Sequence, residues 1–187
     1  MTEGHRILST EQVFEGRVVS VFVDELSLPD GRRARWERVA HPGAVGIVPL
    51  MSDGTVLMVR QYRNAVGGDL LEIPAGKLDR DEPARECAER ELAEEVGMRA
   101  GELIKIAEFY NSPGFSDEYF HLYLARDLRH AQGATDPDEF LEVERHPLQE
   151  LLGMISLGEL VDAKSIVGVS LATLFLSGGV APLVGEA

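Results

Sequence analysis

Short runs of alternating hydrophobic and polar residues, bounded by turn residues, recur along this chain and predict β-strands. From residue 13 to residue 28 the apolar residues follow a strand-like rhythm. The turn signal Pro29-Asp30-Gly31 then leads into a returning strand at residues 34–39. Further strands are predicted at residues 44–50, 55–62, 70–73, 103–110, 119–125 and 140–145.

Helical periodicity appears at other positions. At about 100° per residue, one apolar stripe of a helix is formed by Ala84, Ala88, Leu92 and Val96. We expect Asp81 to cap the start of this helix and Gly97 to end it. Three more helices are predicted at residues 147–154, 157–161 and 165–176. Strands and helices mixed without regular βαβ alternation predict an α+β fold, or an αβα sandwich with a mixed sheet.

The chain divides by its pattern into a main domain and an N-terminal β extension. At 187 residues it is long enough for one domain with a full core. Residues 1–42 precede that core and resemble an extra hairpin, which is too small to be stable alone. The extension must therefore pack on its own core or on a second subunit. The main domain is expected at residues 43–178, followed by a C-terminal tail at 179–187.

Composition and net charge limit the classes of molecule that this protein is expected to bind. The hydrophobic fraction of 44% and the charged fraction of 27% are ordinary for a globular protein. A net charge of −14 argues against duplex nucleic acid and anionic membranes as partners. The N-terminus lacks a signal pattern, and the apolar run at residues 165–176 is too short to span a bilayer. We therefore expect a cytoplasmic protein.

The single cysteine, Cys87, excludes an internal disulfide. It falls inside the predicted helix, near its acidic face, and is expected to be a buried, inert thiol.

Acidic residues are concentrated near the end of the predicted helix. Glu91, Glu94 and Glu95 stand three and four residues apart, so their carboxylates converge on a face beside the apolar stripe. Grouped hard oxygen ligands suit Mg²⁺ or Mn²⁺. Arg90 lies beside this cluster and is placed to orient a carboxylate. The alternative is a solvated acidic face in which Glu86 pairs with Arg90.

The full spacing of this segment resembles the Nudix box, GX5EX7REUXEEXGU, where U is a bulky aliphatic residue. Every fixed position is matched, by Gly76, Glu82, Arg90, Glu91, Leu92, Glu94, Glu95, Gly97 and Met98. The resemblance implies an αβα sandwich that hydrolyses a nucleoside diphosphate linked to another group. It also implies metal ligands, which are Glu91 and Glu95 first, then Glu94, the backbone carbonyl of Ala75, and Glu139. Glu82 either binds a metal or braces Arg90.

A general base is expected outside the box. Residues 135–143 form an acidic loop running into a strand, and they resemble the catalytic loop of several ADP-ribose pyrophosphatases. Glu139 is the first candidate for the base and Glu142 the second. With Arg90 and Glu95 of the box, these two glutamates make up the expected catalytic residues. The alternative is a solvated acidic loop.

Substrate contacts are suggested by two further segments. Pro113 lies 15 positions beyond Met98, which resembles the marker of the ADP-ribose pyrophosphatase subfamily. The aromatic ring of Phe115 is suited to stacking on a base. An arginine fork suits diphosphate oxygens, and residues 59–76 also resemble that subfamily. The expected substrate residues are Arg60, Arg63, Glu72, Gly76, Pro113, Gly114, Phe115, Ser116 and Glu118. A plain turn at residues 111–118 is the alternative.

The resemblance implies Mg²⁺-dependent hydrolysis of ADP-ribose to AMP and ribose 5-phosphate, with Mn²⁺ as an alternative metal. A GDP- or UDP-sugar is the alternative substrate, since the same loops would serve it. A non-catalytic nucleotide sensor is an alternative of another class, although this box retains every acidic position. The resemblance also favours a homodimer that uses the N-terminal strands.

Overall fold

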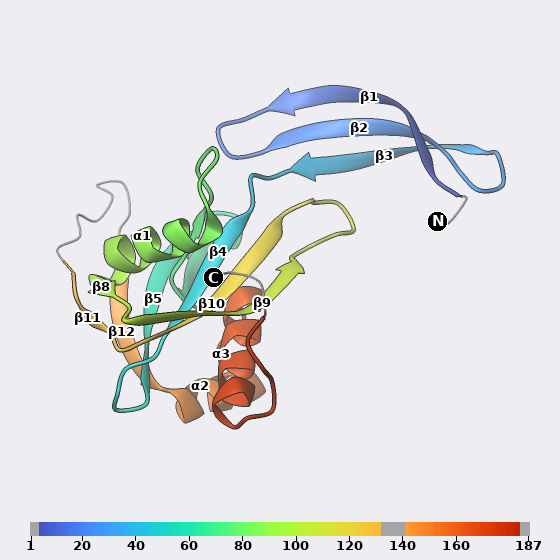
Figure 1. Cartoon of the computed structure of the whole chain (residues 1–187). Coiled ribbons are helices and arrows are strands. Elements are labelled where there is room, and N and C mark those ends of the chain that lie inside the picture. The colour runs from blue at the N-terminus through green and yellow to red at the C-terminus, as the bar shows by residue number, and fades with distance from the viewer. Residues whose placement is uncertain (1–3, 132–140, 184–187) are drawn as a thin grey trace. The chain divides into compact units, whose positions relative to one another are not determined.

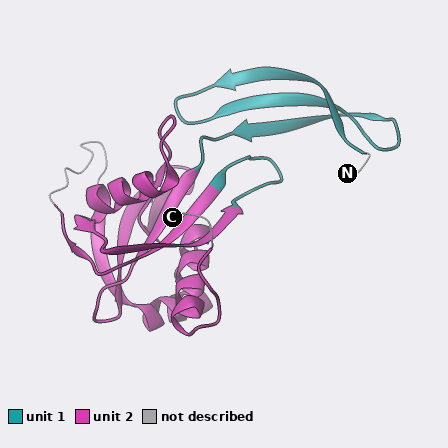
Figure 2. Cartoon of the chain, viewed as in Figure 1, with its two compact units in different colours: residues 1–43, 110–119 teal, residues 44–109, 120–187 magenta. Residues whose placement is uncertain are grey.

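The computed structural model describes residues 4–131 and 141–183, and it divides the chain into two compact units (Figures 1 and 2). Unit 1 contains residues 1–43 and 110–119, and unit 2 contains residues 44–109 and 120–187. The strands of unit 1 are β1 (Arg6–Glu15), β2 (Ser20–Ser27) and β3 (Arg33–Ala40). The strands of the remaining chain are β4 (Ala44–Pro49), β5 (Thr55–Arg63), β6 (Gly68–Glu72), β7 (Ala75–Lys77), β8 (Met98–Arg99), β9 (Glu102–Tyr110), β10 (Tyr119–Arg126), β11 (Arg129–His130) and β12 (Glu142–Pro147). The helices are α1 (Ala84–Val96), α2 (Leu148–Leu157) and α3 (Ala163–Leu176).

Unit 1 is built on a three-stranded antiparallel sheet in the order β1-β2-β3. The stretch from residue 13 to residue 28 is divided by a turn in which the Gly16 N–H donates to the Val19 carbonyl at 2.9 Å. The N-terminal extension therefore has one strand more than a hairpin. The first half of β1 is not predicted by the pattern, because all ten residues of this strand are exposed and residues 6–12 show no regular apolar alternation.

Unit 2 has an αβα arrangement around a mixed sheet. Its four-stranded sheet has the order β7-β4-β10-β9, in which β10 is parallel to β4 and β7 is antiparallel to it. A second sheet, β12-β5-β6, is antiparallel. All six residues of β4 are buried. These features confirm the expected α+β fold with a mixed sheet.

Side chains alternate between two hydrophobic clusters along β4. Val45 and Ile47 pack in the cluster that contains Leu92 of α1. Val48 packs in the other cluster, which contains Leu151 of α2 and Val169 of α3. Because successive side chains of a strand point to opposite faces, α1 covers one face of the sheet and α2 with α3 covers the other (Figure 1).

Helix α1 carries the acidic segment and follows most of its predicted pattern. Its end at Gly97 is confirmed, because this residue adopts the left-handed conformation with φ 65°. The predicted cap at Asp81 is wrong. The residue before the helix is Pro83, and Asp81 lies in a turn with φ 62°. Proline disfavours helical conformation in the preceding residue, so the helix cannot include Glu82.

The helix predicted at residues 157–161 is also wrong. Helix α2 extends to Leu157, and Gly158 ends it in the left-handed conformation with φ 73°. The following residues lead to Asp162, which caps α3 by accepting a hydrogen bond from the Ser165 N–H. Within the part of the chain that the structure describes, no helix is long and apolar enough to cross a membrane.

Candidate active site

Arg90 of α1 lies at the centre of the acidic residues of the box. Its Nε and Nη2 donate to the two carboxylate oxygens of Glu82 at 2.9 and 3.0 Å. Its Nη1 donates to Glu91 Oε1 at 2.7 Å and to Glu94 Oε2 at 3.0 Å. One guanidinium group therefore holds three carboxylates, an arrangement that the planar, multiply donating arginine side chain suits better than lysine. The sequence expectation that Arg90 orients a carboxylate is consistent with this geometry.

Glu82 is the brace of this cluster. Its bidentate pair with Arg90 is the principal reason why the pKa of the Glu82 carboxyl falls to about 2. The same carboxylate accepts from the Asp79 N–H at 3.0 Å and so ties the loop before α1 to the cluster. Of the two roles considered for Glu82, the geometry shows the bracing of Arg90.

Glu91 and Glu95 are buried carboxylates beside strand β7. Their residues are 8% and 5% exposed, which is unusual for glutamate. The Ala75 N–H donates to Glu95 Oε2 at 3.0 Å. Gly76 lies against Glu91, so closely that a Cβ at position 76 would lie 2.6 Å from Glu91 Cγ and nearer still to its carboxylate. The box glycine therefore leaves the space that the Glu91 side chain fills.

Replacing Gly76 with alanine is expected to lower kcat about tenfold, because the added methyl group displaces the Glu91 carboxylate. Steady-state kinetics of the variant would measure this loss. Gly153→Ala is the matched control, since a Cβ at that position of α2 meets nothing within 4 Å. Equal kcat values for the two variants would show that the position of Glu91 does not matter for turnover.

The oxygen atoms near Gly76 have the chemistry of a divalent cation site. Among residues 4–131 and 141–183, no three His, Cys, Asp or Glu side chains form a cluster that could hold a metal ion. Arg90 engages Glu91 and Glu94 in this arrangement. The donor set itself still fits a hard cation, because it consists of buried carboxylates close to the β7 backbone.

Arg63 of β5 and Glu72 of β6 form an ion pair in which the carboxylate is buried and the arginine side chain is partly exposed. Arg63 donates through Nε and Nη2 to the two oxygens of Glu72, at 2.8 and 2.7 Å. Glu72 also accepts from Lys164, the second residue of α3. The sequence does not predict the role of this lysine, because nothing in the local pattern links a helix start to a strand 92 residues earlier.

Arg60 is not part of this ion pair and bonds to a different carboxylate. Its Nε donates to Glu144 on the neighbouring strand β12, and this bond raises the pKa of the Arg60 guanidinium. Glu142 is paired in register with Arg60 and is exposed. Glu139, the first candidate for the general base, lies outside the described residues.

The loop at residues 110–119 belongs to unit 1 and is fixed against β3. The Val39 N–H donates to the Phe115 carbonyl at 2.7 Å, and the Asp117 N–H donates to the Val39 carbonyl at 3.1 Å. Pro113, Gly114 and Phe115 are exposed. Ser116 Oγ accepts from the Glu118 N–H at 3.2 Å. A cavity of about 300 Å³ in this unit is lined by Asp24, Leu26, Trp36, Glu37, Arg38, Tyr110, Pro113, Gly114, Phe115, Ser116 and Asp117.

Cys87 is fully buried on α1, and burial raises the pKa of its thiol far above the ordinary value. This agrees with the expectation of an inert thiol.

Comparison with known proteins gives a consistent result. The model of the NUDIX domain matches residues 40–166. The chain is 39% identical over 166 residues to an ADP-ribose pyrophosphatase of Bacillus subtilis (strain 168), a match that covers 88% of this chain and 90% of that relative. It is 34% identical over 155 residues to a GDP-mannose pyrophosphatase of Escherichia coli O139:H28, covering 76% of this chain and 81% of the relative.

A solved structure described as an ADP compounds hydrolase superimposes with a TM-score of 0.85 at 28% sequence identity. That match covers 94% of this chain and 95% of the other. The similarity therefore extends over both units of the chain.

Proposed function

The chain belongs to the Nudix hydrolase family, and from this premise we propose that it hydrolyses ADP-ribose to AMP and ribose 5-phosphate with Mg²⁺ as cofactor. The observation that carries the proposal is the set of box carboxylates that Arg90 holds beside Gly76. The ADP-ribose pyrophosphatase relative supports the choice of substrate.

The reaction replaces a phosphoanhydride bond by a bond to water. Water attacks one phosphorus atom, the bridging oxygen leaves with the bonding electrons, and a carboxylate takes the proton of the water. Nudix hydrolases generally use divalent metal ions, which supply positive charge against the negative charge that develops on the diphosphate. Glu91, Glu94, Glu95 and the Ala75 carbonyl are the groups that we propose hold the metal. Mn²⁺ is the alternative ion.

The role of Arg90 in this scheme is to fix its neighbours. Its bidentate pair with Glu82 anchors the guanidinium, and the remaining donor holds Glu91 and Glu94. The carboxylates are therefore held in place before substrate arrives, which reduces reorganisation during the reaction. Glu139, and after it Glu142, are the proposed general bases.

Arg63 is the proposed contact for the diphosphate. Its side chain is 40% exposed although Glu72 holds two of its nitrogen atoms. A partly exposed arginine with a fixed plane is well suited to phosphate oxygens. Glu72, Arg60 and Gly76 complete the proposed set in unit 2, and residues 113–116 with Glu118 are proposed to select the base and ribose.

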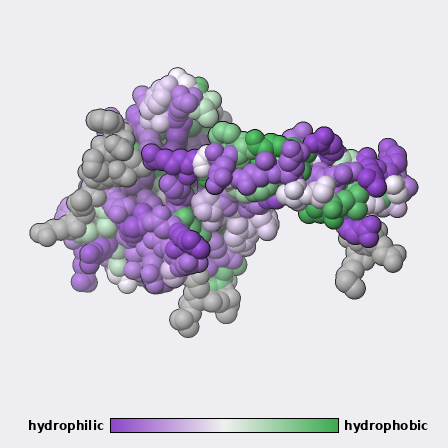
Figure 3. Space-filling view, turned by 90° about the horizontal axis from the view of Figure 1, so that it is seen from above, coloured by the Kyte–Doolittle hydropathy of each residue, from purple (hydrophilic) through white to green (hydrophobic). Residues whose placement is uncertain are grey.

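We also propose that the protein is a homodimer. β1 is exposed along its whole length and carries Ile7, Val13 and Phe14 at the surface. Figure 3 shows hydrophobic side chains in green among the hydrophilic ones on the N-terminal unit. An exposed edge strand with apolar residues is expected to be covered by another chain.

A product-resolved assay of the purified protein with Mg²⁺ tests the substrate. We expect ADP-ribose, which yields AMP, to be hydrolysed faster than GDP-mannose, UDP-glucose or a nucleoside triphosphate, each followed by release of its own nucleoside monophosphate. Faster hydrolysis of GDP-mannose would keep the reaction and replace the substrate, as the GDP-mannose pyrophosphatase relative suggests. Binding without turnover of any substrate, with Mn²⁺ also tried, would favour a nucleotide sensor.

A further inference from the structure

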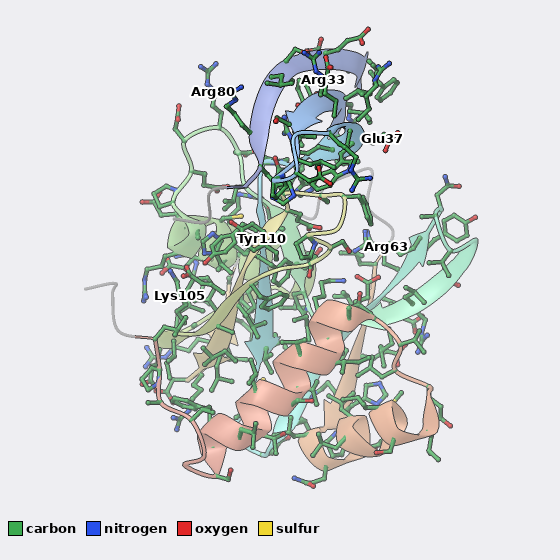
Figure 4. The ribbon with its side chains drawn as sticks, turned by 90° about the vertical axis from the view of Figure 1, so that its right-hand side faces the viewer. Arg33, Glu37, Arg63, Arg80, Lys105 and Tyr110 are labelled. Atoms are coloured by element: carbon green, nitrogen blue, oxygen red, sulfur yellow. The ribbon has the colours of Figure 1, made fainter. Side chains whose placement is uncertain are left out.

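The buried carboxylate of Glu72 is shared by two cations. Its residue is only 1% exposed, and it accepts from both Arg63 and Lys164. Burial acts to raise the pKa of the Glu72 carboxyl, but hydrogen bonds and charge from the two cations outweigh burial and lower it. Glu72 is therefore an anion at neutral pH. In Figure 4, Arg63 lies near one end of α3, the helix that provides Lys164.

Lys164 is fixed by the cap of its own helix. Its ammonium group lies 3.0 Å from Asp162 Oδ1, and its side chain is 12% exposed. The other oxygen of Asp162 accepts from the Ser165 N–H at 3.0 Å. Ser165 Oγ in turn accepts from the Ile73 N–H at 2.8 Å, next to Glu72 in the chain. Lysine, cap and strand β6 therefore form one connected hydrogen-bonded group.

The charges of the four bonded side chains cancel, while the Glu95 carboxylate also acts on Arg63 through its charge. Glu72 and Asp162 carry two negative charges, and Arg63 and Lys164 carry two positive charges. Removal of Lys164 leaves two carboxylates against one arginine, so the group becomes anionic. The two carboxylates then more than offset the positive charge of Arg63, which weakens its attraction for an anionic substrate. Coulomb interactions in a partly buried region are strong enough for one charge to change anion binding.

The geometry points to Lys164 as a positioning residue: it balances the charge of Glu72 and so keeps Arg63 oriented and electrostatically available to a diphosphate. This inference rests on the proposed function, in which Arg63 contacts the diphosphate. The ammonium group of Lys164 is bonded to the carboxylates of Glu72 and Asp162. Lys164 therefore acts on Arg63 through Glu72, which both cations share. The role assigned to it is in substrate binding, whereas the box carboxylates serve the chemical step.

The test compares KM and kcat of Lys164→Met with those of the wild type, with ADP-ribose and Mg²⁺. We expect KM to rise about tenfold while kcat changes less than about threefold. Lys164→Arg should have a KM close to that of the wild type, since arginine restores the positive charge. Lys105→Met is the matched control, because Lys105 has a similar exposure of 13% and pairs with Glu108 at 2.9 Å. Figure 4 shows Lys105 well apart from Arg63.

Thermal unfolding of each variant separates this role from a structural one. If Lys164 only stabilised α3, its replacement would lower Tm, and at a temperature where the variant is folded KM would be unchanged. Calorimetric binding of ADP-ribose without metal gives a second measurement that needs no turnover.

The outcomes distinguish the two proposals. If the wild type hydrolyses ADP-ribose and Lys164→Met has the same KM, the positioning role is wrong and the proposed function stands. If the wild type binds ADP-ribose without hydrolysing it, weaker binding by Lys164→Met supports the role while the proposed function fails. If the wild type neither binds nor hydrolyses ADP-ribose, both proposals are wrong.

Discussion

Replacing Glu95 with glutamine is expected to lower kcat by roughly 10²–10³-fold while the fold is retained. Glu95 is buried at the edge of the box, and its Oε2 accepts from the Ala75 N–H. Glutamine keeps the shape and an acceptor oxygen, so the hydrogen bond survives. The negative charge is lost, and with it the attraction for a divalent cation. Activity measured over a Mg²⁺ titration should show both a lower maximum and a higher metal requirement.

Glu89→Gln provides the control for this experiment. Glu89 lies on the same helix, is exposed, and pairs with Arg85 at 3.4 Å. Its loss should leave kcat and the metal requirement close to those of the wild type. Near-normal turnover of Glu95→Gln at ordinary Mg²⁺ would show that Glu95 is not a metal ligand.

Replacing Arg90 with methionine is expected to lower both activity and stability. Three carboxylates lose their shared partner, so Glu82, Glu91 and Glu94 repel one another. We expect a loss in kcat of about 100-fold, as for residues that orient metal ligands. The free energy of unfolding should fall by about 2 kcal/mol, between the values for exposed and buried pairs, because Arg90 is 31% exposed. Urea unfolding and steady-state kinetics would measure the two effects.

The pH dependence of stability gives a second test of Arg90. The pKa of Glu82 is lowered from 4.5 to about 2, chiefly by its hydrogen bonds to Arg90. A lowered native pKa contributes stability that is present above pH 4.5 and is lost as the pH falls towards 2. The Arg90→Met variant should lack this part of the acid dependence. Arg85→Met, on the exposed side of the same helix, should retain it. An unchanged acid profile for Arg90→Met would contradict the assigned cause of the pKa shift.

The sequence predicted the parts of the fold that local periodicity encodes. The apolar stripe of α1 and its end at Gly97 follow directly from spacing, and so does the mixed arrangement of strands. Where a strand is exposed on both faces, as β1 is, its apolar residues do not alternate regularly, so its first half could not be detected. Asp81 has the side chain of a good cap, but Pro83 disfavours helical conformation at Glu82, so the helix starts later than the capping preference alone predicts.

In the candidate site, too, the local spacing of residues was predictable and the long-range contacts were not. The box spacing placed the glutamates on one face of a helix, and the structure adds that Arg90 holds three carboxylates together. The link between Lys164 and Glu72 could not be predicted, since it joins residues 92 positions apart and depends on how α3 packs. Pairings of this kind are set by tertiary structure and leave no periodic trace in the chain.

The sheet order also has a consequence for how the protein is made. β4 is buried on every residue, yet its neighbour β10 and its covering helix α3 come much later in the chain. Until residues 119–176 have been synthesised, a nascent chain exposes an apolar strand whose hydrogen bonds are unmet on one side. Such strands pair readily with other chains, and long-range parallel pairing forms slowly. Production of this protein should therefore be sensitive to C-terminal truncation and to translation pauses before β10, with aggregation as the visible result.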